Sequence, residues 1–332
     1  MAYETGAASD LEDLISKVDT FMVANGWTQD QLDTGANQAA WSKNSVFVSV
    51  AWATTASTGE MSIHQATGYS GGNRPGTHTG DSGNGYNTGA SPTEVNILTE
   101  RGVQGIGNGP FPSYHIFEQD SGPAHVYVVV EISSEIFRHF GWGEADKTGD
   151  WSGGEFAYGS RHTVSSAVSN SNVCLLDGLF LDTSGENERR AATMRISGMP
   201  NQPGGSVWGQ VWGADGSTIP DDTASNAKIN IQGGFRSGPI ARALGWVKAG
   251  TTSGLIPGYP IALWWNDEVN DFVYFLGYMA NVRGVNIETI APGQEVVIGS
   301  DTWVFFPTAQ KTLVTGSNRS YHQGLMYKKV TA

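Results

Sequence analysis

The sequence has one cysteine, few basic residues and no long apolar run. Cys174 by itself excludes an internal disulfide framework and a cysteine-based zinc cluster. Nineteen Lys and Arg residues against 32 Asp and Glu residues leave a formal net charge of −13, which repels a polyphosphate backbone, so we expect no nucleic-acid partner. No run approaches the roughly 18 apolar residues of a membrane-spanning helix, and the first residues lack a signal-peptide pattern. We therefore expect neither membrane insertion nor secretion by a signal peptide.

Glycine and aromatic residues are abundant instead. The 44 glycines have no collagen-like period, and aromatic residues make up 11% of the chain, a combination typical of many short strands joined by tight turns. We expect a mainly β fold, either an antiparallel β-sandwich or a barrel-like sheet, with an N-terminal amphipathic α-helix and long glycine-rich loops. Residues 1–164 would contain the helix, a β-meander and a long loop at 68–92. Residues 165–332 would form a second β-rich part, either separate or continuous with the first as one domain.

The segment L-E-D-L-I-S-K-V-D-T-F-M-V-A predicts the helix. Ser9 and Glu12 have the spacing of a capping box, and the apolar residues between Leu11 and Met22 fall on one stripe. Asn25 and Gly26 then provide a left-handed stop, after which Trp27 can fold back onto the stripe. The apolar face packs either on the sheet of the same chain or on a neighbouring subunit.

Alternating residues predict antiparallel strands in the middle and at the end of the chain. The run H-V-Y-V-V-V-E places successive side chains on opposite faces, and strands at Tyr114–Glu118 and Phe137–Trp142 flank it in a meander. Gly149, in the turn that follows, suits a positive φ. Further strands are predicted at 46–51, 61–64, 173–181, 189–196, 206–212, 261–265, 272–276, 295–298, 302–306 and 324–330.

The long loop at 68–92 is the candidate contact surface. It contains eight glycines and several polar residues, and a loop of this length is usually functional or flexible. It is either a mobile excursion or an arm that becomes ordered on a partner. The candidate partner contacts in it are Tyr69, Arg74, His78 and Tyr86.

Reactive side chains are present, but no pattern brings them together. Cys174 lies in the apolar run V-C-L-L, where a thiolate is disfavoured. The acidic segments do not follow the order of a calcium loop, and no glycine cluster has the context of a phosphate loop. We expect no catalytic residue, no cofactor and no metal. Carboxylate pairs suited by residue type to glycoside hydrolysis lie where turns are predicted: Asp146 and Asp150, Glu144 and Glu155, Asp267 and Asp271.

Five segments carry a family resemblance. They are L-E-D-L-I-S-K-V-D-T-F-M-V-A-N-G-W-T near the start, P-S-Y-H-I-F, H-V-Y-V-V-V-E and F-G-W-G-E-A-D-K-T-G-D-W-S-G-G-E-F in the middle, and the run from Leu276 to Pro307 near the end. Together they resemble a virion structural protein of tailed bacteriophages, in which F-G-x-x-x-K-x-G-x-W-x-G-G follows a valine-rich strand. The spacing here departs from that pattern by Glu144-Ala145-Asp146. The resemblance implies a component of the tail, neck or baseplate and supplies no catalytic residues.

The sequence therefore predicts a non-enzymatic structural component of a phage particle. It would be located in the virion, assemble in the host bacterial cytoplasm, form a homo-oligomer and contact other virion proteins. The competing hypothesis is a tail-tip adhesin or carbohydrate-binding module, and a cell-wall or capsule hydrolase is third.

Overall fold

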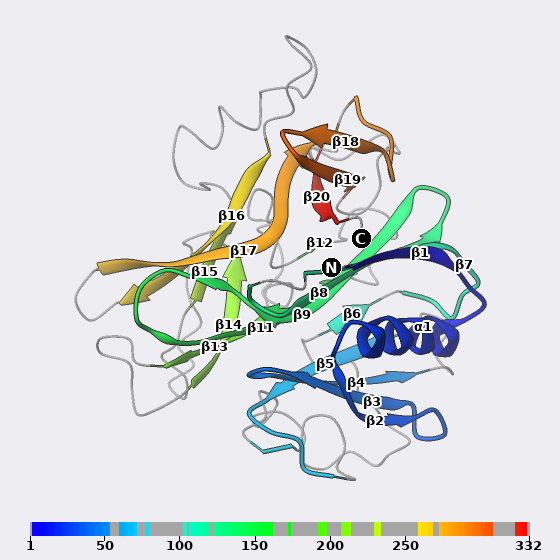
Figure 1. Cartoon of the computed structure of the whole chain (residues 1–332), viewed down its shortest axis with the longest axis horizontal. Helices are drawn as coiled ribbons and strands as arrows, with labels where there is room; N and C mark the ends of the chain where they lie inside the picture. The colour runs from blue at the N-terminus through cyan, green and yellow to red at the C-terminus, as the bar shows by residue number, and fades with distance from the viewer. Residues whose placement is uncertain are drawn as a thin grey trace.

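The structure is a computed structural model of the whole chain. It describes residues 2–53, 60–71, 78–79, 102–104, 106–119, 122–161, 172–173, 192–197, 207–213, 229–233, 258–267, 272–287, 289–307 and 323–330. Within these ranges the protein is mainly β, with one α-helix, α1 (Leu11–Ala24), as Figure 1 shows. The candidate contacts Arg74 and Tyr86, the nucleophile candidate Cys174 and most of the predicted strand at 173–181 lie outside them.

The described strands form two sheets. The small sheet contains, in order, β2 (Thr28–Asp33), β3 (Gln38–Lys43), β4 (Val46–Ala53), β5 (Glu60–Ala66) and β6 (Gly102–Gln104). The large sheet has the order β1 (Ala2–Ala8), β7 (Phe111–Glu118), β8 (His125–Ser133), β9 (Ile136–Glu144), β11 (Ser152–Arg161), β13 (Ala192–Ser197), β14 (Val207–Gly213), β15 (Ile229–Gly233), β16 (Tyr259–Asp267), β17 (Phe272–Asn286), β20 (Gln323–Lys329), β19 (Asp301–Pro307) and β18 (Glu295–Ile298). Two short strands complete it: β10 (Asp146–Lys147) pairs with β17, and β12 (Asn172–Val173) pairs with β11.

The large sheet is open and folds back on itself like a sandwich. Its described neighbours are antiparallel except for β14 and β15, which are parallel. The barrel-like alternative is wrong, because β1 and β18 stand at opposite ends of the described strand order and do not pair with each other. The sheet also crosses the predicted domain boundary at 164, since β11 pairs with β13.

The predicted meander is confirmed as β7, β8 and β9, and its middle strand is buried on both faces. Val126, Val128 and Val130 belong to one hydrophobic core, whereas Tyr127 and Val129 belong to another. A strand that is covered on both faces has an almost continuously apolar sequence, which explains V-Y-V-V-V. The strand therefore separates two cores.

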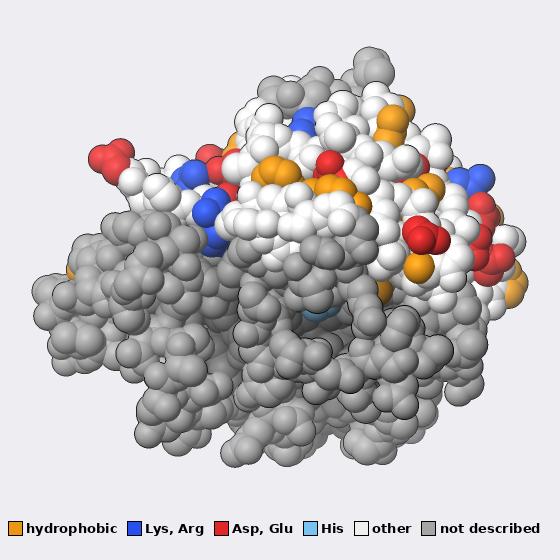
Figure 2. Space-filling view, turned by 90° about the horizontal axis from the view of Figure 1, so that it is seen from below, with side chains coloured by type: hydrophobic (Ala, Val, Ile, Leu, Met, Phe, Trp, Pro, Cys, Tyr) orange, Lys and Arg blue, Asp and Glu red, His pale blue; other side chains and the backbone are white. Residues whose placement is uncertain are grey.

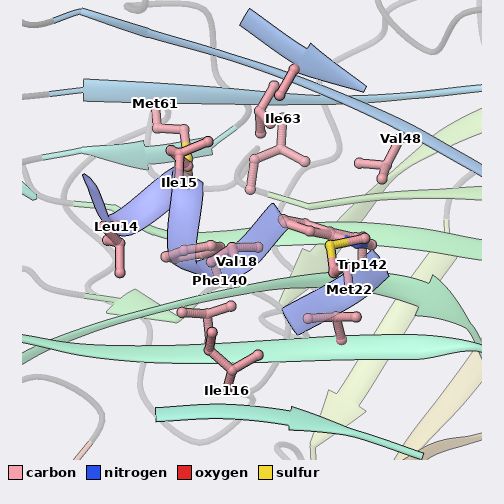
Figure 3. Packing of buried hydrophobic residues seen from close by; sticks show 14 of the residues in the cluster. Leu14, Ile15, Val18, Met22, Val48, Met61, Ile63, Ile116, Phe140 and Trp142 are labelled. Carbon is pink, nitrogen blue, oxygen red and sulfur yellow. The ribbon is translucent and has the colours of Figure 1, made fainter. Parts of the chain in front are cut away.

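The first core lies between α1, the small sheet and one face of the meander. Figure 3 shows Ile15 and Val18 of the helix between Ile63 of β5 and Phe140 of β9. The predicted helix thus packs on sheets of its own chain. The indole rings of Trp41 and Trp142 stack across this core with their centroids 5.7 Å apart.

The second core is aromatic and lies between the meander and the returning strands β17, β19 and β20. The rings of Phe117 and Tyr327 stack 5.0 Å apart, and Tyr127 donates a hydrogen bond from its hydroxyl group to the Ala280 carbonyl at 2.8 Å. Offset and tilted rings at such distances stabilise a core beyond the burial of their area. These contacts attach the C-terminal strands β17, β19 and β20 to the meander of β7, β8 and β9.

The ends of α1 differ in part from the sequence prediction. The capping box on Ser9 and Glu12 is wrong by one position, because Asp10 is the N-cap residue and accepts a bond from the Asp13 amide at 2.8 Å. Asp13 accepts from the Ser9 amide at 2.9 Å, so the return bond of the capping box comes from the residue before the N-cap. At the C-terminal end the Trp27 amide donates to the Met22 carbonyl at 3.0 Å, and the left-handed stop at Gly26 is confirmed.

Glycine in F-G-W-G permits close contact between β8 and β9. A Cβ atom at Gly143, where φ is +153°, would lie 2.3 Å from the His125 Cβ atom, and one at Gly141 would lie 2.6 Å from the Val126 carbonyl oxygen. Neither position accepts a side chain without displacement of the backbone. The predicted positive φ of Gly149 is confirmed at +88°.

We predict that truncation of β8 weakens folding by a similar amount on either face. Val128→Ala opens a cavity in the first core and Val129→Ala one in the second, so each should lower the free energy of unfolding by about 2 kcal/mol. Chemical denaturation measures both. The matched control is Val297→Ala, because Val297 is 69% exposed and its truncation should change stability by less than about 0.5 kcal/mol. An unchanged stability for either β8 variant would contradict burial on both faces.

Candidate functional site

The structure brings together two of the four candidate contacts. The side chains of Tyr69 and His78 lie with their ring centroids 5.0 Å apart. Both residues belong to the described ends of the predicted long loop, which are residues 67–71 and 78–79. We call these two short segments the clasp.

The clasp is closed by hydrogen bonds between its two segments. The Thr67 amide donates to the Thr79 carbonyl at 2.9 Å, and an isolated antiparallel bridge joins Gly68 to Thr79. The hydroxyl groups of Ser70 and Thr79 lie 2.7 Å apart. Short polar residues favour such closure because their side chains bond to nearby backbone and to one another.

The clasp covers the outer face of the small sheet, the face turned away from the first core. There the sheet presents Phe47 among small or polar residues, and the Tyr69 hydroxyl donates to the Gln31 side-chain oxygen at 3.2 Å. A cavity of about 10 Å³ remains between clasp and sheet. Its lining consists of Asp30, Ala40, Trp41, Phe47, Val48, Ser49, Ala66, Gly68, Tyr69 and His78.

His78 is the titratable group at the centre of this site. Its side chain is 4% exposed, and its Nδ1 atom accepts a hydrogen bond from the Ser70 amide at 3.3 Å. Burial lowers the pKa of the imidazole below its ordinary value, while the Asp30 carboxylate acts in the opposite direction. The imidazole is therefore neutral at pH 7.

Sequence reasoning missed Asp30 and Ser49 as members of the site. A signal was present for Ser49, because it alternates with Val48 and Val50 along β4 and therefore points away from the first core. No signal connected either residue to His78, since the clasp that covers them is a tertiary feature.

Figure 2 shows the molecule from below the view of Figure 1. On its described part the acidic side chains are scattered singly and in small groups. The acidic side chains of that part are thus spread, which is the arrangement expected of a solvated surface.

Of three other histidines, His125 and His139 are buried and His115 is partly buried. Burial lowers the pKa of His115, His125 and His139 to about 4 in each case. The His139 ring lies between the Tyr327 hydroxyl group and the Pro307 carbonyl, at 2.8 Å from each. Burial likewise raises the pKa values of Tyr127, Tyr158 and Tyr327 above their usual range. These groups are uncharged at neutral pH and serve the packing of the cores.

One carboxylate pair considered from the sequence is adjacent in the structure. Glu144 on β9 and Glu155 on β11 are direct cross-strand partners. Each binds its own cation: Lys147 lies 2.7 Å from Glu144, and Arg195 binds Glu155 through two of its nitrogen atoms. The arrangement is that of two ion pairs. Of the other pairs, Asp271 lies outside the described residues, and Asp146 is exposed on the short strand β10.

The described residues contain no group of three or more His, Cys, Asp and Glu side chains placed to hold a metal ion. Within the same ranges, no helix has the length and apolar character needed to cross a membrane. No known protein-family model and no curated protein matches this chain. Its function is therefore inferred from its residues and their geometry.

We predict that acid destabilises the fold between pH 6.5 and 4. The unfolded chain binds protons at histidines with an ordinary pKa near 6.5, while the buried imidazoles stay neutral down to about pH 4, so stability decreases as the pH falls through this window. Each of the fully buried residues His125 and His139 should contribute roughly 3 kcal/mol to this loss. Denaturant midpoints measured at intervals across the window provide the test.

The control is His139→Gln, which keeps a donor and an acceptor but does not titrate. Its stability should fall less steeply with acid than that of the wild-type protein. Parallel pH profiles for the two proteins would show that His139 is not held neutral by burial.

Proposed function

We propose that this protein is a non-enzymatic structural component of a tailed-bacteriophage particle, of tail, neck or baseplate type. It would assemble in the host bacterial cytoplasm with copies of itself and with other virion proteins. The observation that carries the proposal is that the large sheet ends, within the described strand order, in two edge strands, β1 and β18. The resemblance of five segments to phage virion proteins supplies the type of particle.

The edge strand β18 has the properties of a strand that pairs with another chain. Its sequence is E-V-V-I, without proline, and Val297 exposes 69% of its side chain. Its only charged residue, Glu295, is bound by Lys329 at 2.7 Å and is therefore partly neutralised. Monomeric proteins protect edges with free charges, prolines or very short strands, and β18 has only the last of these, its length of four residues. Its backbone groups therefore remain open to pairing over that length.

The opposite edge strand, β1, also has a carboxylate that is engaged within its own sheet. Glu4 of β1 accepts a hydrogen bond from the Tyr114 hydroxyl at 2.7 Å, which keeps its carboxylate near its own sheet. Two different edges on one subunit allow head-to-tail contacts, and such contacts close into rings when the rotation between subunits permits it. A ring also makes each weak contact count many times.

We predict that Val297→Lys reduces self-association. A charge at the exposed centre of β18 opposes strand pairing, so the variant should show a lower oligomer mass than the wild-type protein in sedimentation and native mass spectrometry. The matched control is Val23→Lys, at an exposed position near the end of α1 and outside β18. An equal decrease of oligomer mass in both variants would argue against assembly through β18. Electron cryo-microscopy of an intact particle that contains no density for this chain would contradict the structural function itself.

A specific arrangement favours the adhesin hypothesis as the second candidate. Tyr69 and His78 lie side by side, with Gln31 hydrogen-bonded to the tyrosine hydroxyl and Asp30 lining the adjacent cavity. An aromatic ring bordered by amide and carboxylate groups is suited to bind a sugar by stacking and hydrogen bonding.

We predict that, if this second function holds, glycan-array binding is lost on Tyr69→Ala and on Tyr86→Ala. The control is Tyr278→Ala, since Tyr278 is 38% exposed on β17 in the other part of the protein. Wild-type protein that binds no glycan on the array would eliminate the adhesin. Binding that survives both loop substitutions would place the glycan elsewhere.

A further inference from the structure

Three polar atoms around the cavity beneath the clasp have no hydrogen-bond partner among the described residues. They are Asp30 Oδ2, Ser49 Oγ and His78 Nε2. Ser49 is 2% exposed and His78 is 4% exposed, so bulk water does not satisfy them freely. An unsatisfied buried polar group costs about 1–3 kcal/mol, and three around one cavity indicate a bound species that pairs with them.

The Ser70 amide determines which proton the imidazole carries. Because this N–H donates to Nδ1 at 3.3 Å, Nδ1 holds a lone pair and the ring proton of the neutral imidazole is on Nε2. The residues that line the cavity therefore offer one unpaired donor on His78, one unpaired acceptor on Asp30, and on Ser49 a hydroxyl group that can do either. This is the set of partners that a single water molecule satisfies.

Size and chemistry both favour water over a metal ion. A cavity of about 10 Å³ has room for roughly one water molecule. A metal on Nε2 would require the proton on Nδ1, where it would face the Ser70 amide proton. We propose that one buried water molecule links His78 of the clasp to Asp30 of β2 and Ser49 of β4, and that protonation of His78 opens this link.

Protonation of His78 opens the clasp because the new N–H at Nδ1 and the Ser70 N–H are then two donors that face each other. A second proton on the imidazole must occupy Nδ1, and the bond from the Ser70 amide is then lost. Among the described lining residues the other titratable groups are Asp30 and Tyr69. The lining from β3, β4 and β5 carries none, and His64 of β5, the cross-strand partner of Ser49, is the neighbouring titratable group on the sheet. Asp30 favours the charged imidazole, while burial opposes it more strongly and lowers the pKa of His78. The clasp is therefore closed at neutral pH and is released as the pH falls below about 6.5.

Hydrogen exchange of the full-length chain tests whether the clasp opens on acidification. Peptides that cover the clasp are followed from pH 7.5 to pH 5 by mass spectrometry, with rates corrected for the intrinsic effect of pH. Exchange in the wild-type clasp should become about tenfold faster on acidification, the factor expected for the loss of one buried hydrogen bond. A peptide from β8 reports global opening and should remain protected over the pH range in which the clasp opens.

His78→Gln is the decisive variant. Its amide oxygen can accept from the Ser70 N–H, its amide group can donate into the cavity, and it does not titrate. Clasp exchange in this variant should not change with pH. The control His115→Gln removes a partly buried histidine that bonds to Tyr3, away from the cavity, and should keep the wild-type response of the clasp. The same pH response in the wild-type protein and in His78→Gln would overturn the proposal.

Asp30→Asn provides a second, independent test if His78→Gln does not fold. Loss of the carboxylate removes the charge that favours protonated His78, so the clasp should open at a lower pH than in the wild-type protein. An unchanged or higher opening pH would contradict the arrangement. Added Zn²⁺ should not alter the melting temperature. A Zn²⁺-dependent rise that disappears in His78→Gln would identify a metal site and overturn the assignment of water.

Discussion

The burial of both faces of β8 is the constraint on which the rest of the structure depends. One strand contributes valines to a core shared with α1 and the small sheet, and contributes Tyr127 and Val129 to the aromatic core shared with the C-terminal strands. Neither layer can shift without disturbing the other, because close-packed interiors transmit small changes in volume. The close approach of Gly143 to His125 has the same origin, since β8 and β9 leave no room for an additional side chain.

The two cores also decide where function can reside. Imidazole and phenol groups enclosed between the sheets are held in their neutral forms, because the low-dielectric interior disfavours their charged forms. Glu144 and Glu155, which do meet, are each bound by a cation. Among the described residues, groups open to a partner therefore include the sheet edges and the outer face of the small sheet. Both of our proposals concern these places.

The open edges and the clasp would act differently in a particle. Strand pairing at an edge depends mainly on backbone hydrogen bonds and is tolerant of side-chain identity. The clasp depends on a few polar atoms around a cavity, so it responds to protonation. A subunit with both features would have one surface for permanent contacts and another for conditional ones.

The sequence by itself determined the local elements of this protein. The helix stripe, the stop at Gly26, the alternation in β8 and the hairpin of β18 and β19 follow from periodicity and turn chemistry, which act over a few residues. Even there the N-cap lies one position later than predicted, because the side chains of Asp10 and Asp13 can accept backbone hydrogen bonds as those of Ser9 and Glu12 can. Only the tertiary structure decided that the large sheet stays open, that Glu144 faces Glu155, and that His78 meets Asp30 and Ser49. Those contacts join residues distant along the chain, and strand patterns show that a face is buried without showing which residues cover it.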